Sequence, residues 1–452
     1  MLRVSLLLLL ALAALPTPAS AQPLPFVGSD APDEFVPGAW WLARTQIGFR
    51  GGLSLVGPRW HAMGGLNLEY ARPGFSTQIQ EIGRVTTDGF RTDDTDEPYD
   101  ALRSIRYVRW TPRKGKVFYA RMGPLRDVRL GTGHLVNFLA TDAAWDERTI
   151  GAEVGVRLPG VRVEAFSSDV GGAPLAGGYL QTRPFGWTNV PILNASKLGV
   201  TYVRDFLASP NFDALGIDLS VALVESGGFT VEPYVSYARM GTFAETGGRT
   251  DGQSLKIGIS GGSPSILDIA RVEGRAALLY SGEDFITGFF GPLYQVENTY
   301  SAPLDSERFV NSDSTDRRTF GVRLPESAGA TGFETEMRLL VFQRFQIWYA
   351  LYSHYGSQAL TTSRLRLFYG TPDGLSVGLR SDRNGLSGFS ALFSSFNDQS
   401  TLAIHGEYPI RPGLGAGFEA RYTYVRFDDP SGERRFLVQR RFDPYVFYRV
   451  RL

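Results

Sequence analysis

Charged side chains recur at every second position in several apolar stretches of the sequence. In TIGAEVGVRL, Glu153 and Arg157 alternate with apolar residues, and Arg162 and Glu164 do the same in the next stretch. Residues two apart on a strand share one face, so carboxylates and guanidinium groups gather there. Such a face can orient polar solutes in a pore, or its charges can pair with one another. The candidate residues are Glu153, Arg157, Arg162, Glu164, Glu334, Glu336, Arg338, Arg364, Arg366, Arg380, His405, Glu407, Glu419 and Arg421.

Histidines are the next candidates for chemistry. His405 and Glu407 lie two residues apart, which allows either an acid and base pair or a simple hydrogen bond. None of the 4 histidines stands in an HExxH or GxSxG context, and Gly131-Thr132-Gly133-His134 lacks the lysine of a phosphate loop. The chain has no cysteine. We therefore predict no catalytic residue, no cofactor and no metal site.

The same alternation predicts long β-strands. In LGAGFEARYTY, one face carries Leu414, Phe418 and Tyr422, and the other carries Glu419 and Arg421. A strand of about eleven residues has the length that a tilted membrane-spanning strand needs. Because an arginine facing lipid at mid-bilayer costs roughly 2–4 kcal/mol, the charged face must be turned to an interior. Turn sequences, such as PG at 159–160 and TPDG at 371–374, separate the strands.

These strands predict an all-β fold, a transmembrane antiparallel up-and-down β-barrel with an even number of strands, about 18–22. A soluble β-sandwich or propeller also alternates apolar and polar residues. Strand length and aromatic residues near strand ends favour the membrane barrel, because a girdle of aromatic rings lies at the lipid headgroups. The girdle candidates are Trp110, Tyr237, Tyr280, Tyr408, Tyr422 and Tyr424.

The chain begins with a predicted secretory signal peptide at 1–21, which has a basic start, an apolar run and a small-residue cleavage site. Residues 22–452 are then expected to form a single barrel domain. If the C-terminus is periplasmic, alternation places the longest connections on the extracellular side. These connections are 85–101, 123–147, 240–252 and 281–315.

Equal numbers of basic and acidic residues, 46 each, give no argument for a nucleic-acid partner.

A barrel with that many strands is too wide for wall side chains alone to fill. Some part of the chain must therefore narrow or plug the lumen. The two long connections 123–147 and 281–315 are the candidates to fold inward.

The C-terminal residues read YVFYRVRL and place Val446, Tyr448, Val450 and Leu452 on one face of a last strand. We expect this strand to close the barrel against the first one near 47–56. Together with the signal peptide and the train of hairpins, it resembles the bacterial outer-membrane β-barrel superfamily, porins in particular. The resemblance implies a location in the cell outer membrane, contact with its lipid, and recognition of the last strand by the barrel assembly machinery. In that superfamily the final residue is usually aromatic, whereas here it is Leu452.

The predicted function is that of a passive, porin-like channel for small hydrophilic solutes. Two alternatives remain open from the sequence. One is a non-conducting barrel that anchors or assembles surface structures, and the other is an outer-membrane hydrolase that uses His405 or His134. The sequence predicts no oligomeric state.

Overall fold

The computed structural model describes residues 44–452 apart from internal stretches. The ranges left out are 57–58, 73, 87–88, 91–98, 111–116, 146–147, 173, 207–211, 227–228, 242–251, 264–268, 283–284, 300–329, 343, 356–360, 372–373, 387–398 and 429–433. The predicted signal peptide at 1–21 lies outside the described residues. Within them, no helix has the length and apolar character to cross a membrane.

Strands make up most of the described chain, and three short helices connect some of them. The strands are β1 (Arg44–Val56), β2 (Arg59–Arg72), β3 (Phe75–Thr86), β4 (Gly89–Phe90), β5 (Ile105–Trp110), β6 (Phe118–Gly123), β7 (Gly151–Leu158), β8 (Val161–Ser167), β9 (Leu175–Thr182), β10 (Ser196–Asp205), β11 (Phe212–Val221), β12 (Val224–Ser226), β13 (Phe229–Gly241), β14 (Gly252–Gly262), β15 (Ala270–Ser281), β16 (Ala330–Val341), β17 (Phe345–Tyr355), β18 (Thr361–Gly370), β19 (Ser376–Leu386), β20 (Ser400–Arg411), β21 (Leu414–Asp428) and β22 (Arg434–Arg451). The helices are α2 (Asp100–Arg103), α3 (Pro191–Asn194) and α4 (Tyr294–Thr299).

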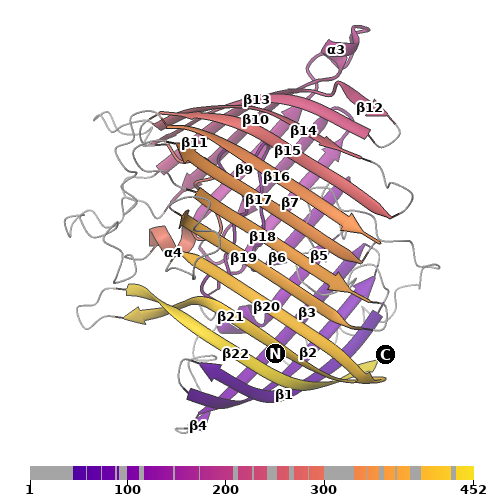
Figure 1. Ribbon diagram of the computed structural model, residues 1–452, viewed down its shortest axis with the longest axis vertical. Coiled ribbons are helices and arrows are strands. Elements are labelled where there is room, and N and C mark those ends of the chain that lie inside the picture. Colours follow the sequence, from indigo (N-terminus) through magenta and orange to yellow (C-terminus); the bar gives the residue numbers. More distant parts are fainter. Residues whose placement is uncertain are drawn as a thin grey trace.

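The strands close into one antiparallel ring (Figure 1). The short strands β4 and β12 pair only at the side of the ring, because β3 pairs directly with β5 and β11 with β13. The ring of the described chain therefore has 20 strands. It is closed between β1 and β22, from Gln46 opposite Arg451 to Val56 opposite Arg441. The predicted even-numbered, up-and-down barrel and its closing strand are confirmed.

Alternation along each strand separates an apolar outer face from a polar inner face. On β11, Leu215, Ile217 and Leu219 are exposed, whereas the intervening Asp218 and Ser220 are buried. At the tight turns, Gly160 and Gly413 adopt φ values of 77° and 80°, a conformation that glycine reaches without steric cost. These turns set the hairpin registers, and the registers keep the charged side chains on the inside.

Exposed aromatic residues lie near both ends of the strand ring. At the end where β1 begins and β22 finishes they are Trp110, Phe118, Phe229, Phe345, Tyr408 and Tyr448, and at the opposite end Trp60, Tyr202, Tyr237, Tyr280 and Tyr355. Such girdles mark the two lipid–water interfaces of a membrane barrel. The girdle prediction was wrong for Tyr424, which is 1% exposed and packs against Ala143, Ala144 and Leu293. The backbone nitrogen of Tyr424 also donates to Ala143, because a connecting segment approaches the wall here from inside.

The element order places the connections after β3, β6, β13 and β15 at the same end of the ring, opposite the end where β1 begins and β22 finishes. These connections contain the four long segments 85–101, 123–147, 240–252 and 281–315. Much of three of them lies outside the described residues, whereas 123–147 is described except for 146–147. The structure therefore shows in detail what this one connection does.

Candidate functional site

Residues 124–145, here called the inner segment, fold back into the barrel. Their apolar side chains are buried, and those of Leu125, Val128, Leu135 and Leu139 are at most 1% exposed. They join one buried cluster with wall residues such as Val203, Ala214, Ala238 and Met240 and with Phe290 and Tyr294 of the β15–β16 connection. Val136 also forms a parallel bridge to Phe290. Of the two candidates to fold inward, 123–147 does so over its described residues, and the described part of 281–315 packs against it through Phe290 and Tyr294.

The backbone of the inner segment turns sharply, and glycine is required at one turn. Gly131 has a φ of 54°, and a Cβ atom there would lie 2.4 Å from the Asp218 carboxylate and 2.8 Å from the Tyr179 ring. Only a residue without a side chain fits between the segment and the wall. The neighbouring Thr132 hydroxyl donates to Asp218 at 3.0 Å.

Ion pairs attach the inner segment to the opposite side of the wall. Asp127 accepts from Arg366 at 2.5 Å, Asp142 accepts from Arg380 at 2.8 Å, and Arg129 donates to Glu336 at 2.7 Å. Burial alone raises the pKa of both aspartates, but the arginines outweigh burial and hold each pKa below its ordinary value. Both aspartates are therefore ionised and contribute to holding the segment in place.

His134 lies in the middle of the inner segment and is 3% exposed. Its Nδ1 lies 2.9 Å from the Ser236 hydroxyl and its Nε2 lies 3.1 Å from the Ser254 hydroxyl. Burial lowers the pKa of His134 well below its usual value, and the charge of Lys256 acts in the same direction. The ring is therefore neutral, and both nitrogens are occupied by wall serines. This geometry gives His134 an anchoring role and leaves no ring nitrogen for proton transfer to a substrate.

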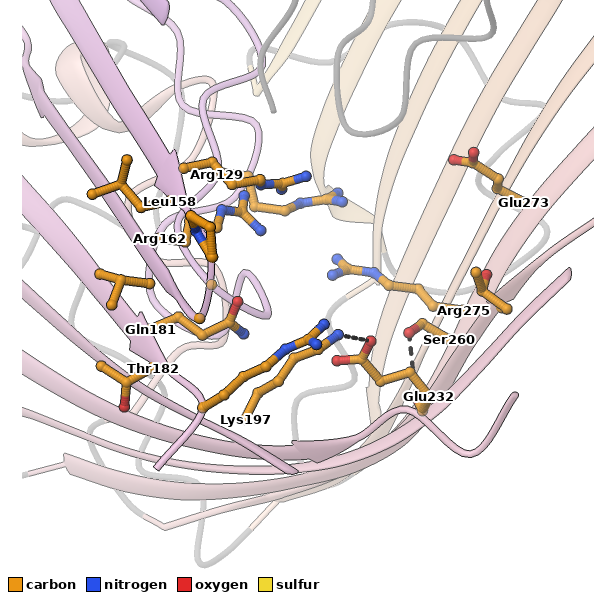
Figure 2. A pocket seen from close by; sticks show the side chains of 18 of the residues that line it. Arg129, Leu158, Arg162, Gln181, Thr182, Lys197, Glu232, Ser260, Glu273 and Arg275 are labelled. Carbon is orange, nitrogen blue, oxygen red and sulfur yellow. Dashed lines mark hydrogen bonds and ion pairs between the residues drawn. The ribbon is translucent and has the colours of Figure 1, made fainter. Parts of the chain in front are cut away.

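A cavity on the inner side of the wall has a volume of about 690 Å³. It lies between the inner segment and the end of the barrel at which β1 begins, since turn residues such as Pro159 and Gly160 line it. Figure 2 shows Arg129, Arg162, Lys197 and Arg275 pointing into this space from different elements. Its described charged lining consists of the bases Arg129, Arg157, Arg162, Arg183, Lys197, Arg275 and Arg338 and the acids Glu232, Glu273 and Glu336. We call it the basic cavity.

The acids of the basic cavity are all engaged by basic partners. Glu336 accepts from Arg129 and also lies 2.8 Å from the Arg275 guanidinium. Glu232 accepts from Lys197 at 2.6 Å, as drawn in Figure 2, and Glu273 accepts from Arg271 at 3.0 Å. The lining itself has seven bases against three acids and so an excess of positive charge, although Arg162 and Arg275 also pair with Glu164 and Glu334 outside it.

A second, smaller cavity of about 100 Å³ contains His405 and Glu407. Glu407 accepts two hydrogen bonds from the Arg449 guanidinium, at 2.5 and 2.6 Å, and one from the Tyr445 hydroxyl at 3.1 Å. A carboxylate with these donors is held as a structural anion. The geometry therefore does not support an acid and base pair of His405 with Glu407.

The structure distributes the fourteen predicted residues over three places. The basic cavity is lined by Arg157, Arg162, Glu336 and Arg338, and the smaller cavity by Arg380, His405, Glu407, Glu419 and Arg421. The others, Glu153, Glu164, Glu334, Arg364 and Arg366, are buried on the inner face of the wall. Pairing is extensive: Arg366 and Arg380 share Asp382, and Glu334 binds both Lys256 and Arg275.

Sequence reasoning missed the charged residues of the inner segment, Arg126, Asp127, Arg129 and Asp142. A signal for them was present, because this connection carries far more large apolar residues than an exposed loop needs. Buried apolar residues in a connection imply that it packs against the wall, and its charges must then find partners there. Among the described residues no group of three histidine, aspartate or glutamate side chains could hold a metal ion.

The closed ring, the apolar outer face and the two aromatic girdles define a transmembrane β-barrel of the outer-membrane type. No protein-family model matches the chain, and no curated protein matches its sequence.

Among solved structures, the chain is similar to OccK3 (OpdO) of Pseudomonas aeruginosa, at 11% identity over 90% of this chain and 96% of that chain, with a TM-score of 0.32. It is also similar to opdK from the same organism, at 11% identity over 91% and 100% of the two chains, with a TM-score of 0.34. OccAB3 of Acinetobacter baumannii gives 11% identity, coverage of 90% and 99%, and a TM-score of 0.29. Because these scores are low, the class of the protein rests on its own strand ring.

Proposed function

We propose that this protein is a porin-like passive channel of the outer membrane for small hydrophilic solutes, and that its basic cavity favours anions. The observation that carries the proposal is a cavity of about 690 Å³, inside a closed membrane barrel, whose lining has an excess of basic side chains. Rings of one charge sign select permeating ions of the opposite sign. Walls of low dielectric concentrate the field and raise the local concentration of such ions.

The charge-reversing substitution Arg157→Glu tests the anion preference. Arg157 is exposed at the rim of the basic cavity, so the change alters the charge that faces this space. We expect the reversal potential of the reconstituted channel, measured across a potassium chloride gradient, to shift away from the chloride potential. The matched control is Arg411→Glu, which makes the same charge change at an exposed position at the same end of the barrel but outside both cavities. Equal shifts in the two variants would contradict a role for the basic cavity.

A non-conducting barrel is the second candidate, and the inner segment favours it. This segment bonds to β13 through Ser236, to β14 through Lys256, to β18 through Arg366 and to β21 through Thr423. A segment bound to so many strands covers part of the lumen. Bilayer recordings separate the two candidates, because a barrel closed by this segment carries no current.

The orientation and export of the chain are part of the same proposal. Export through the signal peptide 1–21 and a periplasmic C-terminus place the long connections on the extracellular side. The barrel assembly machinery would then meet β22, whose Val446, Tyr448, Val450 and Leu452 are all exposed on the outer face. Proteolysis of intact cells, with cleavage confined to the long connections, supports this orientation, and cleavage at the short turns contradicts it.

A further inference from the structure

The connection between β9 and β10, residues 183–195, departs from the pattern of short turns at its end of the barrel. It contains α3, and Figure 1 shows α3 at the top of the view, standing clear of the strand wall. We call residues 184–195 the α3 arm. Its sequence from 184 to 196 contains no charged residue. The flanking Arg183 and Lys197 both line the basic cavity, so the charges stay at the wall while the arm extends away from it.

The α3 arm exposes an unusual amount of apolar surface. Trp187 is 82% exposed, Ile192 61%, Val190 52% and Phe185 43%. Singly exposed apolar residues are normal on a protein, but a cluster with a tryptophan marks an interaction surface.

Several polar groups of the arm are paired within the arm itself. The Asn194 side-chain amide donates to the carbonyl oxygens of Gly186 and Thr188, both at 3.0 Å. The Thr188 hydroxyl donates to the Phe185 carbonyl oxygen at 2.9 Å, and the Asn194 backbone nitrogen donates to Val190. Each group that is paired in this way lowers the cost of entering a poorly hydrated region, since unpaired groups are what make such entry unfavourable.

The arm also continues the lipid-facing surface of the barrel. It joins β9 and β10, whose outer residues Leu180 and Leu198 are exposed, and it lies at the same end as the girdle residues Phe229 and Tyr408. We propose that the α3 arm lies in the lipid interface of the leaflet at this end, with Trp187 and Ile192 inserted at the boundary between headgroups and acyl chains. Tryptophan and branched aliphatic residues on an uncharged segment have the chemistry of an interfacial anchor.

Single-cysteine labelling tests this proposal directly, because the native chain has no cysteine. The variants Trp187→Cys and Val190→Cys are each labelled with an environment-sensitive fluorophore and reconstituted in phosphatidylcholine vesicles. The control is Pro412→Cys, an exposed residue in the tight turn between β20 and β21 at the same end. Heat-modifiable migration on a detergent gel shows that each variant has folded before it is measured.

We expect the labels at 187 and 190 to be quenched by lipids with a shallow nitroxide and to show several-fold less quenching by aqueous iodide than the label at 412. Equal iodide quenching at all three positions would place the arm in water and overturn the proposal. The unlabelled Trp187→Cys variant is tested in parallel for a disulfide between two barrels. If protection from iodide occurs only where that disulfide also forms, a second copy covers the arm, and the proposal is overturned as well.

Discussion

At the scale of single residues, the inner segment is held by charges that the barrel wall must neutralise. Asp142 accepts from both Arg126 and Arg380, and Arg380 also reaches Asp382. Breaking a buried ion pair by removing one partner leaves the other charge buried without compensation, which typically costs about 3–5 kcal/mol. The docking of the inner segment should therefore respond strongly to single neutralising substitutions.

Replacing Asp142 by asparagine should loosen the inner segment without unfolding the barrel. We expect a loss of about 3 kcal/mol in the free energy of docking, because Arg126 and Arg380 lose their common carboxylate. Hydrogen exchange of residues 124–145 measures this loss as faster local opening. The control is Asp169→Asn. Asp169 accepts a hydrogen bond from the Tyr99 hydroxyl and lies outside the inner segment, in another connection at the same end. Unchanged exchange in Asp142→Asn would show that this pair does not hold the segment.

The buried His134 should make docking sensitive to acid. Its pKa is lowered when the segment is docked and returns to about 6.5 when it is free, so the free form binds a proton that the docked form excludes. The docking free energy is therefore fully present above pH 6.5 and falls below it, by about 1.4 kcal/mol per pH unit, until the docked histidine itself is protonated. Protonation of Asp127 and Asp142 lowers the docking free energy further, but only below about pH 4.

Hydrogen exchange of 124–145 at pH 7.5 and 5.5, corrected for the intrinsic pH dependence of exchange, measures this effect. His134→Gln should remove the pH dependence in this range. A native chain whose corrected exchange is the same at both pH values would contradict the neutral, anchoring histidine.

At the scale of elements, the strands could be predicted because their information is local. Alternation with period two fixes which face is apolar, as Leu215, Ile217 and Leu219 show on β11. The path of the inner segment depends on partners far away in the sequence, such as Arg129 and Glu336, which are separated by 207 residues. For the same reason Tyr424 was misplaced in the lipid girdle, since only the approach of Ala143 and Leu293 from inside explains its burial.

The closing strand β22 yields a prediction of its own. Tyr448 lies opposite Phe49 on β1, and Leu452 donates through its backbone nitrogen to Thr45, so both residues belong to the seam. Tyr448→Lys with Leu452→Lys should reduce the fraction of heat-modifiable, assembled barrel, because charge then faces lipid beside the seam. The assembled fraction should keep the native conductance. The matched control is Tyr408→Lys. Tyr408 is exposed near the same end but lies in the β20–β21 hairpin and not at the seam. An equal loss in the control would argue against a special role of the seam.

At the scale of the whole molecule, the proposed function depends on both the closed barrel and its charged interior. The prediction of mixed charges on the inner face could be made from single strands, and the structure places these residues on two cavities and in ion pairs. The excess of basic charge in one cavity could not be predicted, because it depends on which strands the ring and the inner segment bring together. Arg129, Arg157 and Arg275 come from three separate parts of the chain and line the same space.

The central claim is that this barrel conducts small solutes and prefers anions. Single-channel recording of the refolded chain in a planar bilayer, under a potassium chloride gradient, tests it most directly. We expect discrete current steps and a reversal potential displaced toward the chloride potential. The absence of current at every applied voltage, or a reversal potential on the potassium side, would contradict it.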